Sequence, residues 1–267
     1  MAELVELYTK GIKRKLANYW AAWLPGTHVK IGDVGTLNGY LFEKEATLDG
    51  LNIKYYTESQ EQPTSLDISS DTDVSISFKA AGETNPAFEH IGAAEAGIRI
   101  EFGSQGSFIL QAPEVLESEV GDRLNLRRQL VDAFRKDVWD KNWFVITRVV
   151  QATSATVLIS KSSNASLEFS AKANLSSAHA ALGTADAGLT VKHERGDTFR
   201  MISGRDVTPL FQLSRIKTGF FAPPRLQTKS LRAYDPSLAD LTPSHVIRDT
   251  AVEKSLVFDT LLDEELV

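Results

Sequence analysis

The stretch VSISFKAAGETNPAFEHIGAAEAGIRIE, residues 74–101, recurs without a gap 91 residues later as ASLEFSAKANLSSAHAALGTADAGLTVK, residues 165–192. Eight of the 28 aligned positions are identical, and five more exchange similar residues. Both copies open with alternating apolar and polar residues, pass through a connector rich in Ala, Gly and Ser, and return to alternation. A period of two is typical of a half-buried strand. The sequence therefore predicts an internally duplicated unit of strand, connector and strand.

The predicted fold follows from this unit. In the first copy Val74, Ile76 and Phe78 share one face, and the alternation of the return strand continues from Ile98 to Leu110. A strand of that length would exceed the usual five or six residues. We predict an α+β fold, a twisted antiparallel β-sheet with the duplicated strand-connector-strand unit and flanking helices.

Three helices are predicted, at residues 2–23, 122–138 and 243–266, where apolar residues recur at three- to four-residue spacing. Asp122 is placed to cap the second helix. Short apolar runs separated by glycines predict a meander of strands over residues 28–56. The polar residues 57–72 are expected to form an exposed loop.

The predicted organisation is a single α+β domain over residues 1–221, a linker over 222–241 and a C-terminal helical tail over 242–267. The last 20 residues hold six acidic and two basic side chains, whereas the first 24 hold four basic and two acidic ones. Opposite charges permit the tail to dock on the N-terminal region. Fully solvated charge is the alternative.

Composition excludes several classes of function. The net charge of -6 argues against a nucleic-acid partner, which would select a basic surface. The absence of Cys excludes disulfides, thiolate metal sites and thiol nucleophiles. The N-terminus lacks the order of a signal peptide, and no run of 18 apolar residues occurs. We therefore expect a cytoplasmic protein.

No motif points to a reaction. The histidines stand in neither a GxSxG-type nor an HExxH context, and no two of them have ligand spacing. We expect no enzyme, no cofactor and no metal site. The alternative is an enzyme with polar side chains converging around His193, Glu194 and Asp197.

The predicted first helix carries aromatic and basic residues together, as interfacial helices do. We identify a candidate membrane-contact set in and after this helix: Lys10, Lys13, Arg14, Lys15, Trp20 and Trp23. A helix packed on the domain with a solvated basic face is the alternative.

Two amphipathic segments separated by core elements make this layout resemble the gasdermin and perforin-like pore-forming proteins. The resemblance implies refolding of segments 74–101 and 165–192, assembly into a homo-oligomeric ring, and insertion into an anionic membrane. It also implies a role in bacterial defence and a tail that blocks assembly until a protease removes it. The implied inhibitory contacts of the tail are Leu256, Val257, Leu261 and Leu262. The chain departs from bacterial gasdermins in lacking an N-terminal cysteine.

The functional prediction is therefore a pore-forming protein that is cytoplasmic until activation and then membrane-associated. Its main alternative is a non-catalytic binding or scaffolding domain with an internally duplicated β-sheet, because alternation is also what any half-buried antiparallel sheet shows.

Overall fold

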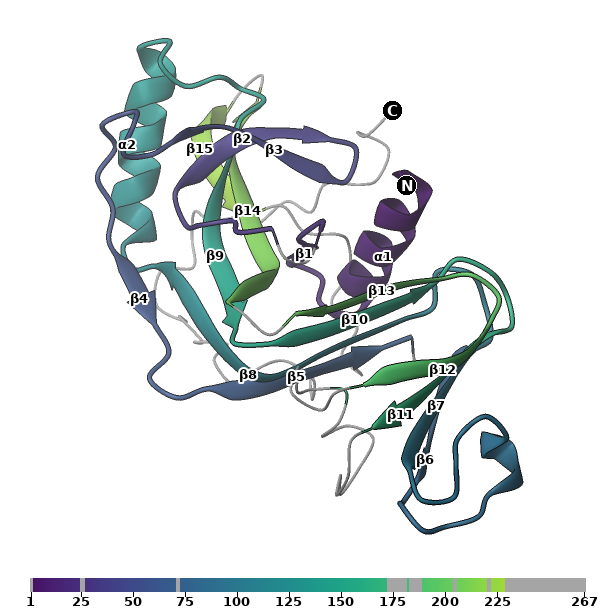
Figure 1. Cartoon of the computed structure of the whole chain (residues 1–267). Helices are drawn as coiled ribbons and strands as arrows, with labels where there is room; N and C mark the ends of the chain where they lie inside the picture. Colours follow the sequence, from purple (N-terminus) through teal and green to yellow (C-terminus); the bar gives the residue numbers. More distant parts are fainter. Residues whose placement is uncertain are drawn as a thin grey trace.

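The computed structural model describes residues 2–24, 27–70, 73–171, 182, 189–203, 206–219 and 222–228 (Figure 1). The helices are α1 (Ala2–Lys15) and α2 (Arg123–Arg135), with a 3₁₀ turn at Pro86–Phe88. The strands are β1 (Trp20–Ala21), β2 (Asp33–Asn38), β3 (Leu41–Thr47), β4 (Thr57–Ser59), β5 (Thr64–Ser69), β6 (Val74–Lys79), β7 (Ala96–Phe102), β8 (Phe108–Val120), β9 (Phe144–Ala152), β10 (Ala155–Ser160), β11 (Ala165–Ala171), β12 (Thr190–Arg195), β13 (Thr198–Ser203), β14 (Val207–Gly219) and β15 (Ala222–Thr228).

The strands form two antiparallel sheets. The large sheet has the order β1-β14-β9-β8-β10-β13, and further strands pair with β14, β9 and β8 along its sides. The small sheet has the order β12-β11-β7-β6 and extends from one end of the large sheet (Figure 1). The α+β prediction is thus confirmed in its mostly antiparallel sheets and its helices, although the strands divide between two sheets.

Alternation along β8 and β10 explains how the layers stack. Phe108 and Leu110 point toward α1, while Ile109 between them points toward the small sheet. On β10, Leu158 likewise faces the small sheet. Because successive side chains of a strand point to opposite faces, one pair of strands supplies two cores. The small sheet therefore packs its apolar face on the large sheet, and α1 covers the other side.

The N-terminal helix is shorter than predicted. Helix α1 ends at Lys15, and Trp20 pairs with Phe211 in the short strand β1. Aromatic residues favour a pleated, half-buried surface, so Trp20 lies outside the helix and joins the sheet. Tyr8 and Ile12 still form the apolar face of α1, and both are fully buried.

Two segments predicted to be irregular are strands. Residues 57–72 contain β4 and β5, which pair with the long strand β8. Residues 222–228, predicted as the start of a linker, form β15 beside β14. Polar residues and prolines are tolerated there because a strand at the side of a sheet needs backbone partners on one side only. The rest of the predicted linker lies outside the described residues.

The long return strand of the first copy is divided. Strand β7 ends at Phe102, and β8 begins at Phe108 after a turn in which Gly106 has a φ of 82°. Just after the second copy, Gly196, with a φ of 80°, separates β12 from β13. Both turns carry the chain from the small sheet to the large sheet. By contrast, the prediction for α2 is confirmed in type and start, with the Asp122 carboxylate accepting a hydrogen bond from the Asn125 N–H at 2.8 Å.

The duplicated segments form two successive hairpins, β6–β7 and β11–β12, but they are not equivalent. Phe78 pairs with Ile98, whereas Phe169, 91 residues later, pairs with Val191 rather than Leu189. A bulge next to Phe169 accompanies this shift of the register. The two hairpins therefore differ in their exact pairing, and the internal duplication stays a prediction from the sequence.

The aligned connector residues Ile91 and Leu182 lie on opposite faces of the small sheet. Ile91 packs over Gly97 on the polar face. Leu182 is fully buried in the core between the two sheets, and its carbonyl oxygen accepts a hydrogen bond from the Thr156 hydroxyl. The rest of the second connector lies outside the described residues.

Candidate functional site

The polar face of the small sheet concentrates charged and polar side chains that the sequence places far apart. Strand β11 is buried along its whole length, on both faces. Its apolar face packs on the large sheet, where Leu167 and Phe169 are buried. Its other face carries Ser166, Glu168 and Ser170, all less than 9% exposed. Because the polar face of β11 is buried, other residues must cover it. Residues 80–95 provide part of that cover.

Glu168 is the central charge of this face. Its side chain is 3% exposed, and Arg99, its cross-strand partner on β7, binds it through Nη1 at 3.2 Å. His90, from the connector after β6, places Nδ1 3.1 Å from the other carboxylate oxygen. A buried carboxylate is costly unless it is paired and hydrogen-bonded. Both requirements are met here by residues of two different elements.

His90 also stacks on His193 of β12. The ring centroids are 3.9 Å apart and the planes differ by 3°. Because an ionised carboxylate can only accept, Nδ1 of His90 is the protonated nitrogen toward Glu168. The stack therefore joins the connector to the outermost strand while the Glu168 contact joins it to β11.

Lys79, the last residue of β6, is 1% exposed. Its Nζ donates to the main-chain carbonyl oxygens of Gly92, Ala93 and Glu95 at 3.0, 3.4 and 2.8 Å. An ammonium has three donors and no acceptor, so these three contacts use its full capacity. The buried Lys79 charge thereby fixes the path of the connector.

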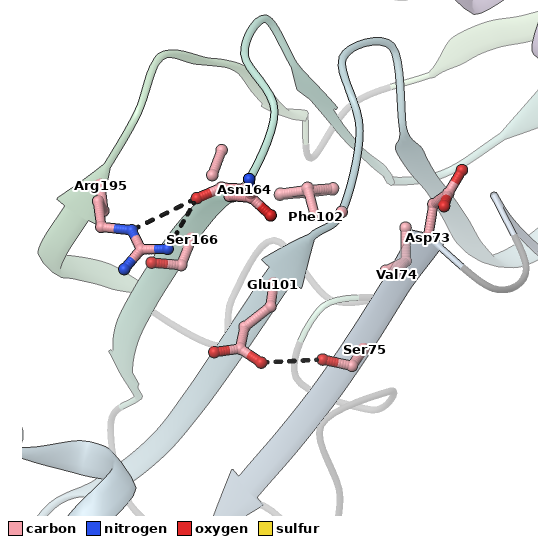
Figure 2. A pocket seen from close by; sticks show the side chains of 10 residues that line it. Asp73, Val74, Ser75, Glu101, Phe102, Asn164, Ser166 and Arg195 are labelled. Atoms are coloured by element: carbon pink, nitrogen blue, oxygen red, sulfur yellow. Dashed lines mark hydrogen bonds between the residues drawn. The ribbon is translucent and has the colours of Figure 1, made fainter.

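A shallow hollow lies where the small sheet joins the large one (Figure 2). It has a volume of about 330 Å³ and is lined by side chains from the ends of β6, β7, β11 and β12. Figure 2 shows Arg195 donating to the carbonyl oxygen of Asn164, and Ser75 donating to Glu101. The lining is mixed in charge, since it includes Asp73, Glu101 and Arg195.

The hollow and the polar face bring together only part of the alternative enzymatic set. His193 and Glu194 are neighbours on β12, but Glu194 binds Arg200 at 3.0 Å and Asp197 binds Lys161 at 3.2 Å. These contacts occupy both carboxylates with structural ion pairs. Within the described ranges, no three His, Asp or Glu side chains are placed to hold a metal ion.

The structure buries two of the six candidate membrane-contact residues. Lys13 is 3% exposed, with Nζ 3.1 Å from the centroid of the fully buried Trp20 ring. The Trp20 indole and the Lys13 side chain therefore belong to the core beside β1, and membrane contact by either residue stays a prediction. Trp23 is half-buried and packs against Phe199, with ring centroids 5.0 Å apart and planes tilted by 34°.

The other three basic residues of α1 differ in their surroundings. Arg14 is exposed, Lys10 pairs with Glu6 at 2.7 Å, and burial lowers the pKa of the half-buried Lys15. Membrane contact by any of them stays a prediction. The predicted tail contacts Leu256, Val257, Leu261 and Leu262 lie outside the described residues.

Sequence reasoning missed the functional grouping on the polar face. Alternation did place Arg99 and Glu168 on that face. No sequence signal indicated that Lys79 and Glu168 would be buried, because burial comes from the connector, whose Ala- and Gly-rich composition has no periodicity. In the described part of the chain, no helix combines the length and apolar character that a membrane span requires.

Comparison with known proteins gives structural similarities only. No protein-family model matches the sequence, and no curated protein matches it. The cryo-EM structure of the gasdermin A3 membrane pore is 9% identical, with a TM-score of 0.33 over 83% of this chain and 93% of that chain. A bacterial gasdermin from Bradyrhizobium tropiciagri is 13% identical, with a TM-score of 0.33 over 84% of this chain and 90% of that chain. The chain is similar in structure to these two gasdermins.

Proposed function

We propose that this chain is a membrane pore-forming protein held inactive by its C-terminal segment, residues 242–267. In this proposal, segments 74–101 and 165–192 refold and pair between copies to line a pore. The observation that carries it is the small sheet, in which both segments form amphipathic hairpins side by side. One face of this sheet is apolar and the other polar, as a strand between lipid and a water-filled lumen requires.

The lengths of the strands agree with a refolding step. Strands β6 and β7 have six and seven residues, whereas a membrane-spanning strand needs about 9 to 11. Residues 80–95 join these two strands directly, so they can lengthen both. The residues between Ala171 and Thr190 stand in the same relation to β11 and β12. Each hairpin therefore carries in its connector the residues that it lacks as a membrane-spanning pair.

The outer strands of the small sheet supply the surface for assembly. Among the described strands, β6 pairs only with β7, and β12 pairs only with β11. An unpaired strand edge is a template for another chain. In lipid every backbone group must be paired, so such edges are permitted only in a closed ring of copies. This supports a homo-oligomer as the membrane-bound form.

Activation would occur by proteolysis of a cytoplasmic precursor, followed by binding to an anionic membrane. Exposed Arg14 on α1 supplies one charge for this contact. The acidic residues of the tail would oppose binding to an anionic surface until the tail is removed, because like charges repel.

The test uses the full chain with a site for a specific protease inserted after Leu241. The uncut protein should leave dye-loaded phosphatidylglycerol vesicles intact, and cutting should cause dye release with the appearance of ring-sized oligomers. Vesicles of phosphatidylcholine alone serve as the lipid control. Absence of dye release after complete cutting, at several positions between 229 and 245, would contradict the proposal.

The second candidate function is a non-catalytic binding or scaffolding domain, and the polar hollow of Figure 2 favours it. Its mixture of Asp73, Glu101 and Arg195 suits a small polar ligand that carries both charges. Replacement of Arg195 by Gln would then weaken the binding of such a ligand, and no cut form of the protein would release dye. A binding domain should also remain monodisperse with vesicles.

A further inference from the structure

We propose that residues 80–95, here called the latch segment, open as a separate unit before the strands of the small sheet can lengthen. The proposal deepens the pore-forming function and rests on it for the consequence of opening. The opening itself is a property of the folded chain alone.

The latch segment contacts all four strands of the small sheet. Lys79 of β6 binds its carbonyl oxygens, and Arg99 of β7 donates from Nη1 to the carbonyl oxygen of Ala87 at 2.7 Å. On β11 the contact is Glu168 with His90. On β12, Lys192 binds Glu95 at 3.3 Å, and His193 stacks on His90. In its closed position the segment therefore holds the two hairpins to each other.

These contacts are mostly polar. The apolar part consists of Phe88 and Ile91, which pack against the backbone at Gly97. A Cβ on Gly97 would lie 2.9 Å from Cδ1 of Phe88 and 2.8 Å from Cδ1 of Ile91, so a larger residue at this position would force both side chains to shift. The remaining residues of the segment are largely Ala, Gly, Glu, Asn and Thr. A segment with few buried apolar side chains has a low free energy of local opening.

Lys79 makes the closed position specific. Its charge is buried only while the carbonyl oxygens of the latch segment surround it, and opening would return it to water. With all three carbonyl partners present, the Lys79 ammonium stabilises the closed state. When one partner is lost, the cost of burying an incompletely hydrogen-bonded charge destabilises that state. This all-or-none character is expected to make the segment open as one unit.

Opening of the latch segment leaves the core intact. The segment lies on the face of the small sheet opposite the apolar core that joins the two sheets, to which Ile98 and Ile100 of β7 belong. Leu182, from the second connector, is part of that core. The first connector can therefore leave the sheet without opening the core between the two sheets, whereas withdrawal of Leu182 would open it. It also contains the residues by which β6 and β7 would have to lengthen.

The first experiment is hydrogen exchange on the full chain. Lys79→Met should speed exchange of the amides in residues 80–95 by about tenfold or more, since a hydrogen bond to a charged group contributes roughly 1.5–3 kcal/mol. Exchange in β10 and α2 should not change. Lys54→Met, at an exposed lysine with no side-chain partner in the described residues, is the matched control.

A second variant tests the same proposal independently, in case Lys79→Met does not fold. Ile91→Ala removes an apolar contact of the latch segment and leaves the charge in place, and it should produce the same local increase in exchange. Uniform acceleration over the whole chain in both variants would contradict a separate unit. Unchanged exchange in residues 80–95 would equally overturn the proposal.

The second experiment fixes the latch segment in place. The chain has no cysteine, so His90→Cys with His193→Cys can be joined by a short bis-maleimide without side reactions at other thiols. On the cut protein of the vesicle assay, the joined form should release no dye, and the unjoined double variant should release it. Lys79→Met should release dye faster than the wild type.

The outcomes separate the two proposals. Dye release by the joined form at the unjoined rate would overturn the latch while leaving pore formation standing. If no cut form releases dye, pore formation fails, and hydrogen exchange alone decides whether residues 80–95 open as a unit.

Discussion

Arg148 of β9 and Glu119 of β8 are directly opposed across the large sheet, and their side chains form an ion pair. Arg148 also binds Glu117 at 2.9 Å, and Arg123 of α2 binds Glu119 at 2.7 Å. The Tyr19 hydroxyl donates to Glu117. This network ties the chain after α1 and the start of α2 to the same two strands.

The network predicts a dependence on acidic pH. Burial favours the neutral form of Glu119, but the hydrogen bond and charge of Arg148 outweigh it, so the pKa of Glu119 lies below its ordinary value. A lowered folded pKa contributes stability above the unfolded value, about 4.3, and this contribution disappears as the pH falls through the folded pKa.

Glu119→Gln should cost about 1 kcal/mol or less near neutrality, because the pair is partly exposed. Urea unfolding at several pH values should show the difference from the wild type vanishing in acid. Glu61→Gln, at an exposed residue, should show no such trend.

Removal of the phenol hydroxyl should have different effects on stability at Tyr8 and at Tyr19. Burial raises the pKa of both phenols, and the Glu117 charge raises that of Tyr19 further. The Tyr8 hydroxyl is buried without a hydrogen-bond partner among the described residues. Tyr8→Phe should therefore leave stability unchanged or raise it by about 1 kcal/mol, and Tyr19→Phe should lower it by about the same amount.

The same two phenols predict sensitivity to alkali. A raised folded pKa contributes stability that is present below the unfolded value, about 10, and is lost as the pH rises toward the folded pKa. The double Phe variant should unfold at a higher pH than the wild type in an ultraviolet titration. An unchanged midpoint would show that neither phenol controls alkaline unfolding.

Gly35 predicts a strict backbone requirement in the β2–β3 hairpin. A Cβ at this position would lie 1.9 Å from the main-chain oxygen of Glu43, which cannot move without breaking the pairing. Gly35→Ala should cost more than about 2 kcal/mol in thermal or urea unfolding. Gly92→Ala, whose nearest neighbour would be 4.0 Å away, is the matched control and should be nearly neutral. Equal stability of the two variants would contradict the close approach.

Truncation to Ala should lower global stability less at Ile91 than at Leu182. Leu182→Ala should lower global stability by about 2–5 kcal/mol, because it leaves a cavity between the two sheets. The loss of unfolding free energy in Ile91→Ala is limited to the free energy of opening the latch segment. Once the segment is open, residue 91 makes no packing contact that the substitution could remove. Urea midpoints, read beside hydrogen exchange in residues 80–95, distinguish the two. Equal losses of unfolding free energy, each above about 2 kcal/mol, would show that both connectors belong to one core.

Arg14 and Lys13 predict different consequences of losing one positive charge of α1. Arg14→Gln should weaken sedimentation with phosphatidylglycerol vesicles by the order of 1 kcal/mol without changing stability. Lys13→Gln should instead lower stability, because the Lys13 ammonium lies over the buried Trp20 ring. Vesicle binding lost equally in both variants would contradict the placement of Lys13.

The amino-acid sequence alone was sufficient to predict the local elements whose signals are short-range. The alternation of Val74, Ile76 and Phe78 specified a strand and its apolar face, since side chains on a strand have a period of two. Asp122 specified the start of α2, because a carboxylate there satisfies an unpaired backbone donor. The polar alternation also assigned Arg99 and Glu168 to one face.

The burial of these residues and the identity of their contacts depended on how the two sheets and the connectors pack together. Glu168 and His90 are 78 positions apart, and their contact depends on the path of a connector with no periodic pattern. Residues 57–59 and 64–69 became strands because β8 offered unpaired backbone groups beside them, a fact absent from their own composition. The gapless repeat aligned Ile91 with Leu182, yet the fold placed them on opposite faces of one sheet. A connector without its own core is positioned by the surface that it covers, and that surface exists only once the sheets have packed.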